Sequence, residues 1–147
     1  AYGPRNISGP LPTFYQRLSS NKPCFVMDTR RDFVYIQDLV DCVEKAVDGT
    51  GHGYYHISSG ADYSIKELFD ATIEALHIKL EKEVEVRERN PDDVFSILLD
   101  PARTQSDFNW NISTPLKTGV KHAIEYYQQY GIEQTYTHLR AHEEASV

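Results

Sequence analysis

Short apolar runs, separated by longer stretches of helical periodicity, are the feature that most restricts the fold of this chain. The runs are about four to six residues long, the length of a short strand, whereas the stretches between them repeat apolar residues every three or four positions. Such alternation favours an α+β class, a small mixed domain of short strands separated by helices. The strand candidates are residues 24–27, 31–36, 54–57 and 83–86.

Capping residues mark where the helices begin. Ser64 and Glu67 have the Ser-x-x-Glu spacing of a capping box, and Asp38 is a candidate N-cap. Pro101 and Pro115 each follow a polar residue, which is typical of the first turn of a helix. The helix after Asp38 is expected to bury one apolar face, made of Leu39, Val40, Val43, Ala46 and Val47.

The 147 residues are enough for one domain with a hydrophobic core. We expect this domain over residues 1–131, followed by a polar tail over residues 132–147. Internal repeats and low-complexity segments are absent from the sequence.

Charge and composition exclude several classes of partner. The net charge is −7, from 22 acidic and 15 basic residues, which argues against nucleic acid because its phosphates require a basic surface. No apolar run approaches the ~20 residues of a membrane helix, and the first residues do not resemble a signal peptide, so we expect a cytoplasmic protein without a membrane partner. Cys24 and Cys42 do not have the spacing of metal ligands and are expected to be buried or half-buried thiols.

The sequence lacks the motifs of a dinucleotide site. Gly-x-Gly-x-x-Gly has to stand between a strand and a helix, but Gly49, Gly51 and Gly53 follow a predicted helix and precede a predicted strand. None of the ten tyrosines is followed by lysine four residues later, the arrangement in which short-chain dehydrogenases activate a tyrosine for proton transfer. The chain is therefore expected to hold neither a nicotinamide cofactor nor a general base of that type.

Several motifs in order resemble those of one enzyme family. They are Tyr-Gly-Pro-Arg at residues 2–5, Arg-Asp-Phe-Val-Tyr-Ile-Gln-Asp at 31–38, Tyr-His-Ile-Ser-Ser-Gly at 55–60, Pro-Asp-Asp-Val at 91–94 and Asp-Pro-Ala-Arg at 100–103 followed by Phe-Asn-Trp at 108–110. This series is similar to the second half of the extended short-chain dehydrogenase/reductases, specifically the nucleotide-sugar epimerases and dehydratases.

The resemblance implies a substrate-binding lobe that accompanies a Rossmann lobe not contained in these residues. In the family, NAD is bound by that N-terminal lobe, and the substrate is a nucleotide-diphosphate sugar that is oxidised transiently and then epimerised or dehydrated. The family often forms homodimers through the other lobe. Alone, this chain is expected to be inactive. The reaction type, the nucleotide and the sugar stay open, as do a stand-alone nucleotide-sugar binding module and an interaction domain that has lost its ligand.

The resemblance also assigns roles to three residues. Arg31 would hold the substrate diphosphate, for which a guanidinium fork is well suited. Asp93 would accept hydrogen bonds from the ribose hydroxyls, and Arg89 is a second phosphate ligand. The alternatives are a surface charge for Arg31, a turn cap for Asp93 and a solvated loop charge for Arg89. Asn90 stands where the family commonly has its second arginine, and His56 replaces the usual asparagine.

Two features near the end of the chain have alternative interpretations. His138 and His142 are four residues apart and next to Glu143, which could hold a metal, but a polar tail without a further ligand is the simpler interpretation. Tyr126, Tyr127 and Tyr130 fit the face of an amphipathic helix better than a platform for stacking bases. No metal is therefore predicted.

Overall fold

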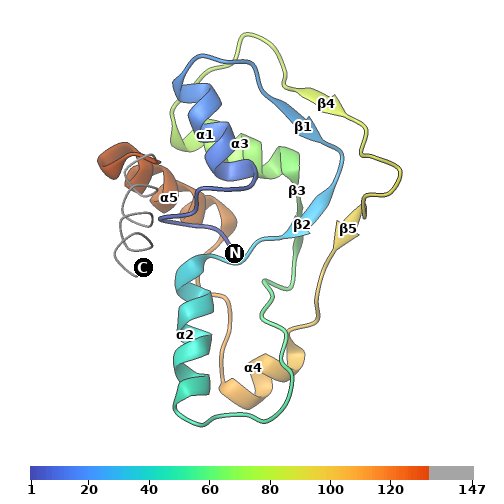
Figure 1. The fold of residues 1–147 in the computed structure, drawn as a ribbon, viewed down its shortest axis with the longest axis vertical. Coiled ribbons are helices and arrows are strands. Elements are labelled where there is room, and N and C mark those ends of the chain that lie inside the picture. The colour runs from blue at the N-terminus through green and yellow to red at the C-terminus, as the bar shows by residue number, and fades with distance from the viewer. Residues whose placement is uncertain (133–147) are drawn as a thin grey trace, which may run out of the picture.

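The computed structural model describes residues 1–132 and shows helices and short strands in mixed order (Figure 1). The small mixed domain predicted from the sequence is thus confirmed in outline. The helices are α1 (Pro10–Ser19), α2 (Ile36–Val47), α3 (Ile65–Ala75), α4 (Ala102–Phe108) and α5 (Leu116–Tyr130). The strands are β1 (Phe25–Met27), β2 (Arg30–Asp32), β3 (Asp62–Ser64), β4 (Glu85–Arg87) and β5 (Ser96–Ile97).

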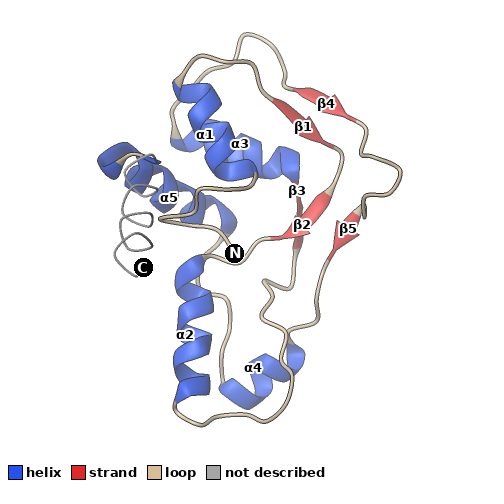
Figure 2. Ribbon diagram, in the orientation of Figure 1, coloured by secondary structure: helices blue, strands red, loops and turns tan. Residues whose placement is uncertain are grey.

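The strands lie together along one side of the molecule (Figure 2). β1 pairs in parallel with β4. β2 lies between two partners, since β3 pairs with it in the antiparallel direction and β5 in parallel. Two later segments of the chain thus lie beside β2, and the polar residues that precede β3 and β5 contact this strand.

The main hydrophobic core lies where α3 contacts α1 and α5 (Figure 1). Phe14 of α1 meets Phe69 of α3 edge to face, with ring centroids 5.1 Å apart. Such apolar burial is the principal source of stability in a domain of this size. The buried hydrophobic residues from α3 and α5 are Ile65, Leu68, Phe69, Ala71, Leu116, Val120, Ala123, Ile124 and Tyr127.

A second, smaller cluster joins α2 to α4, which extend together away from the main core (Figure 1). Cys42 of α2 is buried with Phe108 and Trp110. Tyr55 packs edge to face on Phe108, with ring centroids 4.7 Å apart. The packing of α2 and α4 against each other thus rests on few apolar groups and depends on polar contacts to the rest of the domain.

Asp38 supplies the strongest of these polar contacts. Its side chain is almost fully buried, with 1% of its surface exposed. The carboxylate accepts hydrogen bonds from the backbone N–H groups of Ser113 (3.0 Å) and Thr114 (3.1 Å) and from the Ser113 hydroxyl. Trp110 Nε1 donates to the Asp38 carbonyl at 2.9 Å. One residue therefore joins α2 to the segment that leads into α5.

The local capping predictions had mixed outcomes. The capping box of Ser64 and Glu67 is confirmed, with both reciprocal hydrogen bonds present at the start of α3. The prediction that Asp38 caps α2 was wrong, because the helix already begins at Ile36 and the carboxylate is directed to Ser113 and Thr114. The local pattern around Asp38 indicates an N-cap, but its carboxylate instead accepts hydrogen bonds from Ser113 and Thr114, which are distant in the sequence.

Two further predictions also failed. Residues 54–57 form no strand, and within residues 1–132 no other segment pairs with them. The apolar face predicted for α2 is not buried as a whole, since Val40, Val43 and Val47 are exposed. Both wrong predictions concern residues 36–57.

Over the described residues, every helix is too short or too polar to cross a bilayer.

Replacing Asp38 tests its role in joining α2 to the start of α5. In Asp38→Ala the N–H groups of Ser113 and Thr114 lose their acceptor, so we expect a loss of about 3 kcal/mol of unfolding free energy and a fall of roughly 10 °C in Tm. Calorimetry or circular dichroism measures both. The control is Asp48→Ala, which removes an exposed carboxylate at the other end of α2 and should leave Tm nearly unchanged. Equal Tm values for the two variants would contradict this role.

Two buried tyrosines predict how stability depends on alkaline pH. Burial raises the pKa of Tyr2 and of Tyr127 above the ordinary value of 10.0. At pH values well below this ordinary pKa, both phenols are neutral in the folded and unfolded states. Above it the unfolded chain ionises first, so the unfolding free energy falls with rising pH, by up to about 1.4 kcal/mol per unit for each tyrosine. Urea denaturation between pH 9 and 11 measures this slope.

Tyr127→Phe should make this slope shallower by removing one of the two groups. It should also cost stability at neutral pH, because the Tyr127 hydroxyl lies 2.9 Å from the Asn6 carbonyl and 3.2 Å from that of Gly3. Tyr54→Phe is the matched control, since the Tyr54 side chain is 93% exposed. A slope that is identical in all three proteins would show that burial of Tyr127 does not govern its ionisation.

Candidate functional site

Arg31 occupies the middle of β2, between a residue of β3 and a residue of β5. Its ladder partners are Tyr63 on one side and Ile97 on the other. Nη1 donates to the backbone carbonyls of Arg30 (2.7 Å) and Val94 (2.9 Å). These contacts fix the guanidinium against the polypeptide that enters β5, so its orientation is set before any ligand arrives.

The three residues predicted for the site lie together. Arg31 Nη2 and Asp93 Oδ1 form an ion pair at 3.0 Å, and Arg89 Nη1 donates to the Asp93 carbonyl at 2.9 Å. The Arg31 side chain is 26% exposed and that of Asp93 is 42% exposed. The cluster is therefore accessible from solvent, and both guanidinium groups contact one aspartate, Arg31 through its carboxylate and Arg89 through its backbone carbonyl.

Arg31 keeps part of its donor capacity. A guanidinium has five N–H groups, and the contacts described above occupy both groups on Nη1 and one on Nη2. Within residues 1–132 the N–H of Nε has no hydrogen-bond acceptor. The second N–H of Nη2 is also left over, so two donors on one edge of the guanidinium could receive an anion with several oxygens without removal of the backbone contacts.

Arg30, the neighbour of Arg31, has a different role. It donates from Nε to Asp62 Oδ2 (3.0 Å) and from Nη2 to the Asp62 carbonyl (2.6 Å), and it lies 3.6 Å from Glu67. Hydrogen bonds from Ser96 and from Arg30 hold the pKa of the Asp62 carboxyl below its usual value. Arg30 therefore connects β2, β3 and α3, and it is committed to the fold rather than to a ligand.

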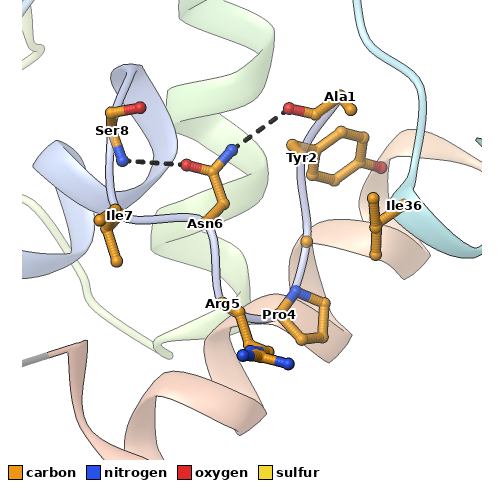
Figure 3. Close-up of a pocket in the computed structure, with 9 residues that line it drawn as sticks. Ala1, Tyr2, Pro4, Arg5, Asn6, Ile7, Ser8 and Ile36 are labelled. Carbon is orange, nitrogen blue, oxygen red and sulfur yellow. Dashed lines mark hydrogen bonds between the residues drawn. The ribbon is translucent and has the colours of Figure 1, made fainter. Parts of the chain in front are cut away.

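A separate hollow of about 430 Å³ is formed by residues 1–8 and Ile36 (Figure 3). Asn6 holds this turn closed, since its amide donates to the Ala1 carbonyl (3.2 Å) and accepts from the Ser8 N–H (3.0 Å). Arg5 is exposed and has a φ of 67°, a left-handed conformation that is uncommon outside glycine. The sequence did not single out Asn6, because both of its contacts depend on how the turn folds.

The glycines at residues 49–53 do not form a dinucleotide-binding loop. The closely spaced glycines of the sequence are Gly49, Gly51 and Gly53. Gly51 packs against the Phe108 ring, and a Cβ at this position would lie 2.7 Å from Phe108 Cζ. Gly51 is thus required by packing and by its φ of +86°, not by the approach of a pyrophosphate.

The remaining candidates are thiols and metal ligands. Cys42 is buried and Cys24 is half-buried, as expected, and burial raises the pKa of both thiols. A metal-binding group of histidine, cysteine and carboxylates is absent from residues 1–132. His138, His142 and Glu143 lie outside the described residues.

Comparison with known proteins decides the family. A sequence model described as GDP-mannose 4,6 dehydratase matches residues 10–123, which is most of the chain. The chain belongs to this family. Its resemblance to the nucleotide-sugar epimerases and dehydratases, inferred above from motifs, is therefore confirmed, and it extends to the solved structures of two enzymes from Bordetella bronchiseptica.

Both of these structures were solved with NAD bound. WbmH, in complex with NAD+, is 56% identical over 88% of this chain, with a TM-score of 0.81. WbmG, in complex with NAD and UDP, is 34% identical over 90% of this chain, with a TM-score of 0.85. The dTDP-4-dehydro-6-deoxyglucose reductase of Escherichia coli is 27% identical over 123 residues.

The chain matches only part of each of these relatives. It covers 43% of the WbmH and WbmG chains and 38% of the Escherichia coli reductase. The chain thus spans less than half of the length of the proteins it matches.

Proposed function

We propose that this chain is the substrate-binding portion of an NAD-dependent nucleotide-sugar epimerase or dehydratase. It would be the α+β substrate lobe, over residues 1–131, that accompanies a Rossmann lobe outside these residues. Arg31 and Arg89 hold the nucleotide diphosphate and Asp93 the ribose, while hydride and proton transfer take place on the other lobe. The observation that carries this proposal is the Arg31–Asp93–Arg89 cluster, in which residues assigned by motif lie in contact.

The charges of the cluster support diphosphate binding. The two arginines exceed the single aspartate by one positive charge, in a chain whose net charge is −7. A diphosphate oxygen can replace the Asp93 carboxylate at Arg31 Nη2 and also use the unoccupied Nε–H, which would give the paired contact typical of arginine with phosphate. Asp93, once released, has both carboxylate oxygens available for ribose hydroxyls.

Holding the diphosphate affects the rate at a distant carbon. Binding energy from a part of the substrate that does not react can orient the sugar against the nicotinamide and thereby lower the barrier to hydride transfer. UDP bound to WbmG, which is 34% identical to this chain, supports a uridine nucleotide as the first ligand to test.

Substitution of Arg31 tests the diphosphate role. We expect UDP to bind this chain with a Kd near ~1 mM, about −4 kcal/mol, because only one side of the substrate cleft is present. NMR titration with UDP, TDP, CDP and GDP should shift the amide signals around Arg31, Arg89 and Asp93. In Arg31→Ala the affinity should fall at least about tenfold, since charge-assisted hydrogen bonds are lost.

Two variants control this titration. Arg103→Ala also removes an arginine that donates to two carbonyls, but on α4, and should keep wild-type affinity. Arg31→Lys retains the charge and should recover only part of the binding because a lysine cannot form the paired contact. Unchanged UDP affinity in Arg31→Ala, in a protein with a native spectrum, would refute the role of Arg31.

Substitution of Asp93 should affect the affinities for two ligands to different extents. Asp93→Asn removes the carboxylate that competes for Arg31, so inorganic pyrophosphate should bind a few-fold more tightly at low salt. UDP should gain less or lose affinity, because an amide replaces one acceptor for the ribose hydroxyls. Isothermal titration of both ligands gives the ratio of their affinities. An equal gain for UDP and pyrophosphate would show that Asp93 does not contact ribose.

A further inference from the structure

The segment that leads into β5 has little apolar burial to hold it in place. Over residues 88–99, Ser96 alone is half-buried, and every other residue is exposed. The five large hydrophobic residues of this segment, from Val94 to Leu99, are between 41% and 55% exposed. Apolar burial is the main force that fixes a segment of chain, so polar contacts have to fix this one.

Ser96 supplies the polar contact that reaches farthest. Its hydroxyl donates to Asp62 Oδ2 of β3 at 2.7 Å. The order of the sheet is β3-β2-β5, so this hydrogen bond spans β2 and joins the two strands that flank it (Figure 2). Within the described part of the chain, the other hydrogen bonds that residues 88–96 make outside their own segment all go to β2.

Asp62 is an acceptor that is itself fixed. Arg30 donates from Nε to the same Oδ2 at 3.0 Å and from Nη2 to the Asp62 carbonyl at 2.6 Å. Hydrogen bonds to an ionised group are stronger than those between neutral groups. The Asp62 side chain is only 30% exposed, which limits competition from water. Ser96 thus attaches its segment to a carboxylate that β2 already holds.

The orientation of Arg31 depends on where this segment lies. Three of its four hydrogen-bond acceptors belong to residues 93–95, namely Asp93 Oδ1 (3.0 Å) and the carbonyls of Val94 (2.9 Å) and Phe95 (3.4 Å). A displacement of these residues relative to β2 would turn the guanidinium. Paired contacts with a phosphate require the plane of this group to be fixed, and a small misplacement weakens a binding site.

We propose that Ser96 and Asp62 are positioning residues for the anion-binding site at Arg31. The hydrogen bond between them sets where residues 93–95 lie, and these residues orient the guanidinium toward a diphosphate. Neither positioning residue contacts the ligand. Successive side chains leave a strand on opposite sides, and both residues lie on the side of Arg30, away from that of Arg31. This inference rests on the proposed function, in which Arg31 holds the diphosphate of a nucleotide sugar.

The first variant removes only the Ser96 hydroxyl. In Ser96→Ala of the 147-residue chain, the Kd values for inorganic pyrophosphate and for UDP should each rise about fivefold, because residues of one hydrogen-bond network are coupled. NMR titration measures both constants. Ser96→Thr keeps a hydroxyl and should keep the wild-type affinities. Asp62→Ala removes the acceptor and should lose at least as much affinity as Ser96→Ala.

A spectroscopic signal reports the orientation of Arg31 without any ligand. Its Nη1 hydrogens are held by carbonyls, so they should give NMR signals distinct from those of an exposed guanidinium such as that of Arg5. Arg31→Ala identifies these signals by their absence. In Ser96→Ala the signals should shift toward those of the exposed arginines. A residue that only stabilises the fold would not move them in a protein that remains folded.

A double variant shows whether Ser96 acts through Arg31. Where two residues act through one contact, the effects of their substitutions are not additive. Ser96→Ala should therefore lower the affinity for pyrophosphate in the wild-type chain but leave it unchanged in the Arg31→Ala background. Equal fold losses in both backgrounds would overturn the proposal, since Ser96 would then act independently of Arg31.

Ser58→Ala is the matched control for stability. The Ser58 hydroxyl donates to the Leu99 carbonyl at 2.8 Å, so it also holds this part of the chain, but beyond β5. Ser58 is fully buried, and its loss should lower Tm while the pyrophosphate affinity and the Arg31 signals stay those of the wild type. Ser106→Ala, at an exposed position of α4, should change neither. An affinity loss in Ser58→Ala as large as that in Ser96→Ala would overturn the proposal, because general loosening would then explain both.

The positioning role and the proposed function fail on different measurements. Unchanged Arg31 signals in Ser96→Ala would overturn the positioning role even where UDP binding depends on Arg31. Shifted signals without a loss of pyrophosphate affinity, in a chain that Arg31→Ala weakens, would overturn it as well. A UDP affinity that is unchanged in Arg31→Ala would refute the proposed function instead, and the Arg31 signals would then decide the positioning by themselves.

Discussion

The buried carboxylate of Asp38 is the contact on which the relative position of the two halves of this structure depends. A charged group with 1% exposure is tolerated because three donors from Ser113 and Thr114 surround it. It sits in the first turn of α2, next to the residues that pair with Tyr2, and it holds the segment that starts α5. The orientation of α2, and with it that of α4, is therefore fixed by polar contacts rather than by a large core.

The two adjacent arginines on β2 have different surroundings. Arg30 and Arg31 point to opposite sides of a strand, so their partners differ completely. Arg30 meets Asp62, which is also held by Ser96, and this cross-link joins three elements. Arg31 meets Asp93 in an exposed loop and shares its Nη1 with backbone carbonyls. An ion pair that is accessible to water contributes little to stability, so loss of the contact between Arg31 and Asp93 would cost the fold little.

What the sequence could predict follows the range of the interactions involved. The capping box of Ser64 and Glu67 is complete within four residues, and its prediction is confirmed. Asp38 carries a similar local signal, yet its partners lie more than seventy residues away, and they overrode it. β2 pairs with β3 and β5, which lie about 30 and 65 residues later in the sequence, and no local pattern indicates which strands pair over such separations. Arg31, Arg89 and Asp93 were named through family motifs, and periodicity alone would not have brought them together.

The strand predicted at residues 54–57 failed for an instructive reason. Its side-chain alternation is present, and so is a hydrogen-bonded edge toward α4, but a ladder needs a second strand. The prediction for the valines of α2 failed in the same way, because they follow the helical repeat but stay exposed in the described residues. Local sequence determines which surface a segment prepares for burial, whereas burial itself requires the partner. Both wrong predictions fall within residues 36–57, where the local pattern records which side chains are apolar but not whether another segment pairs with them or covers them.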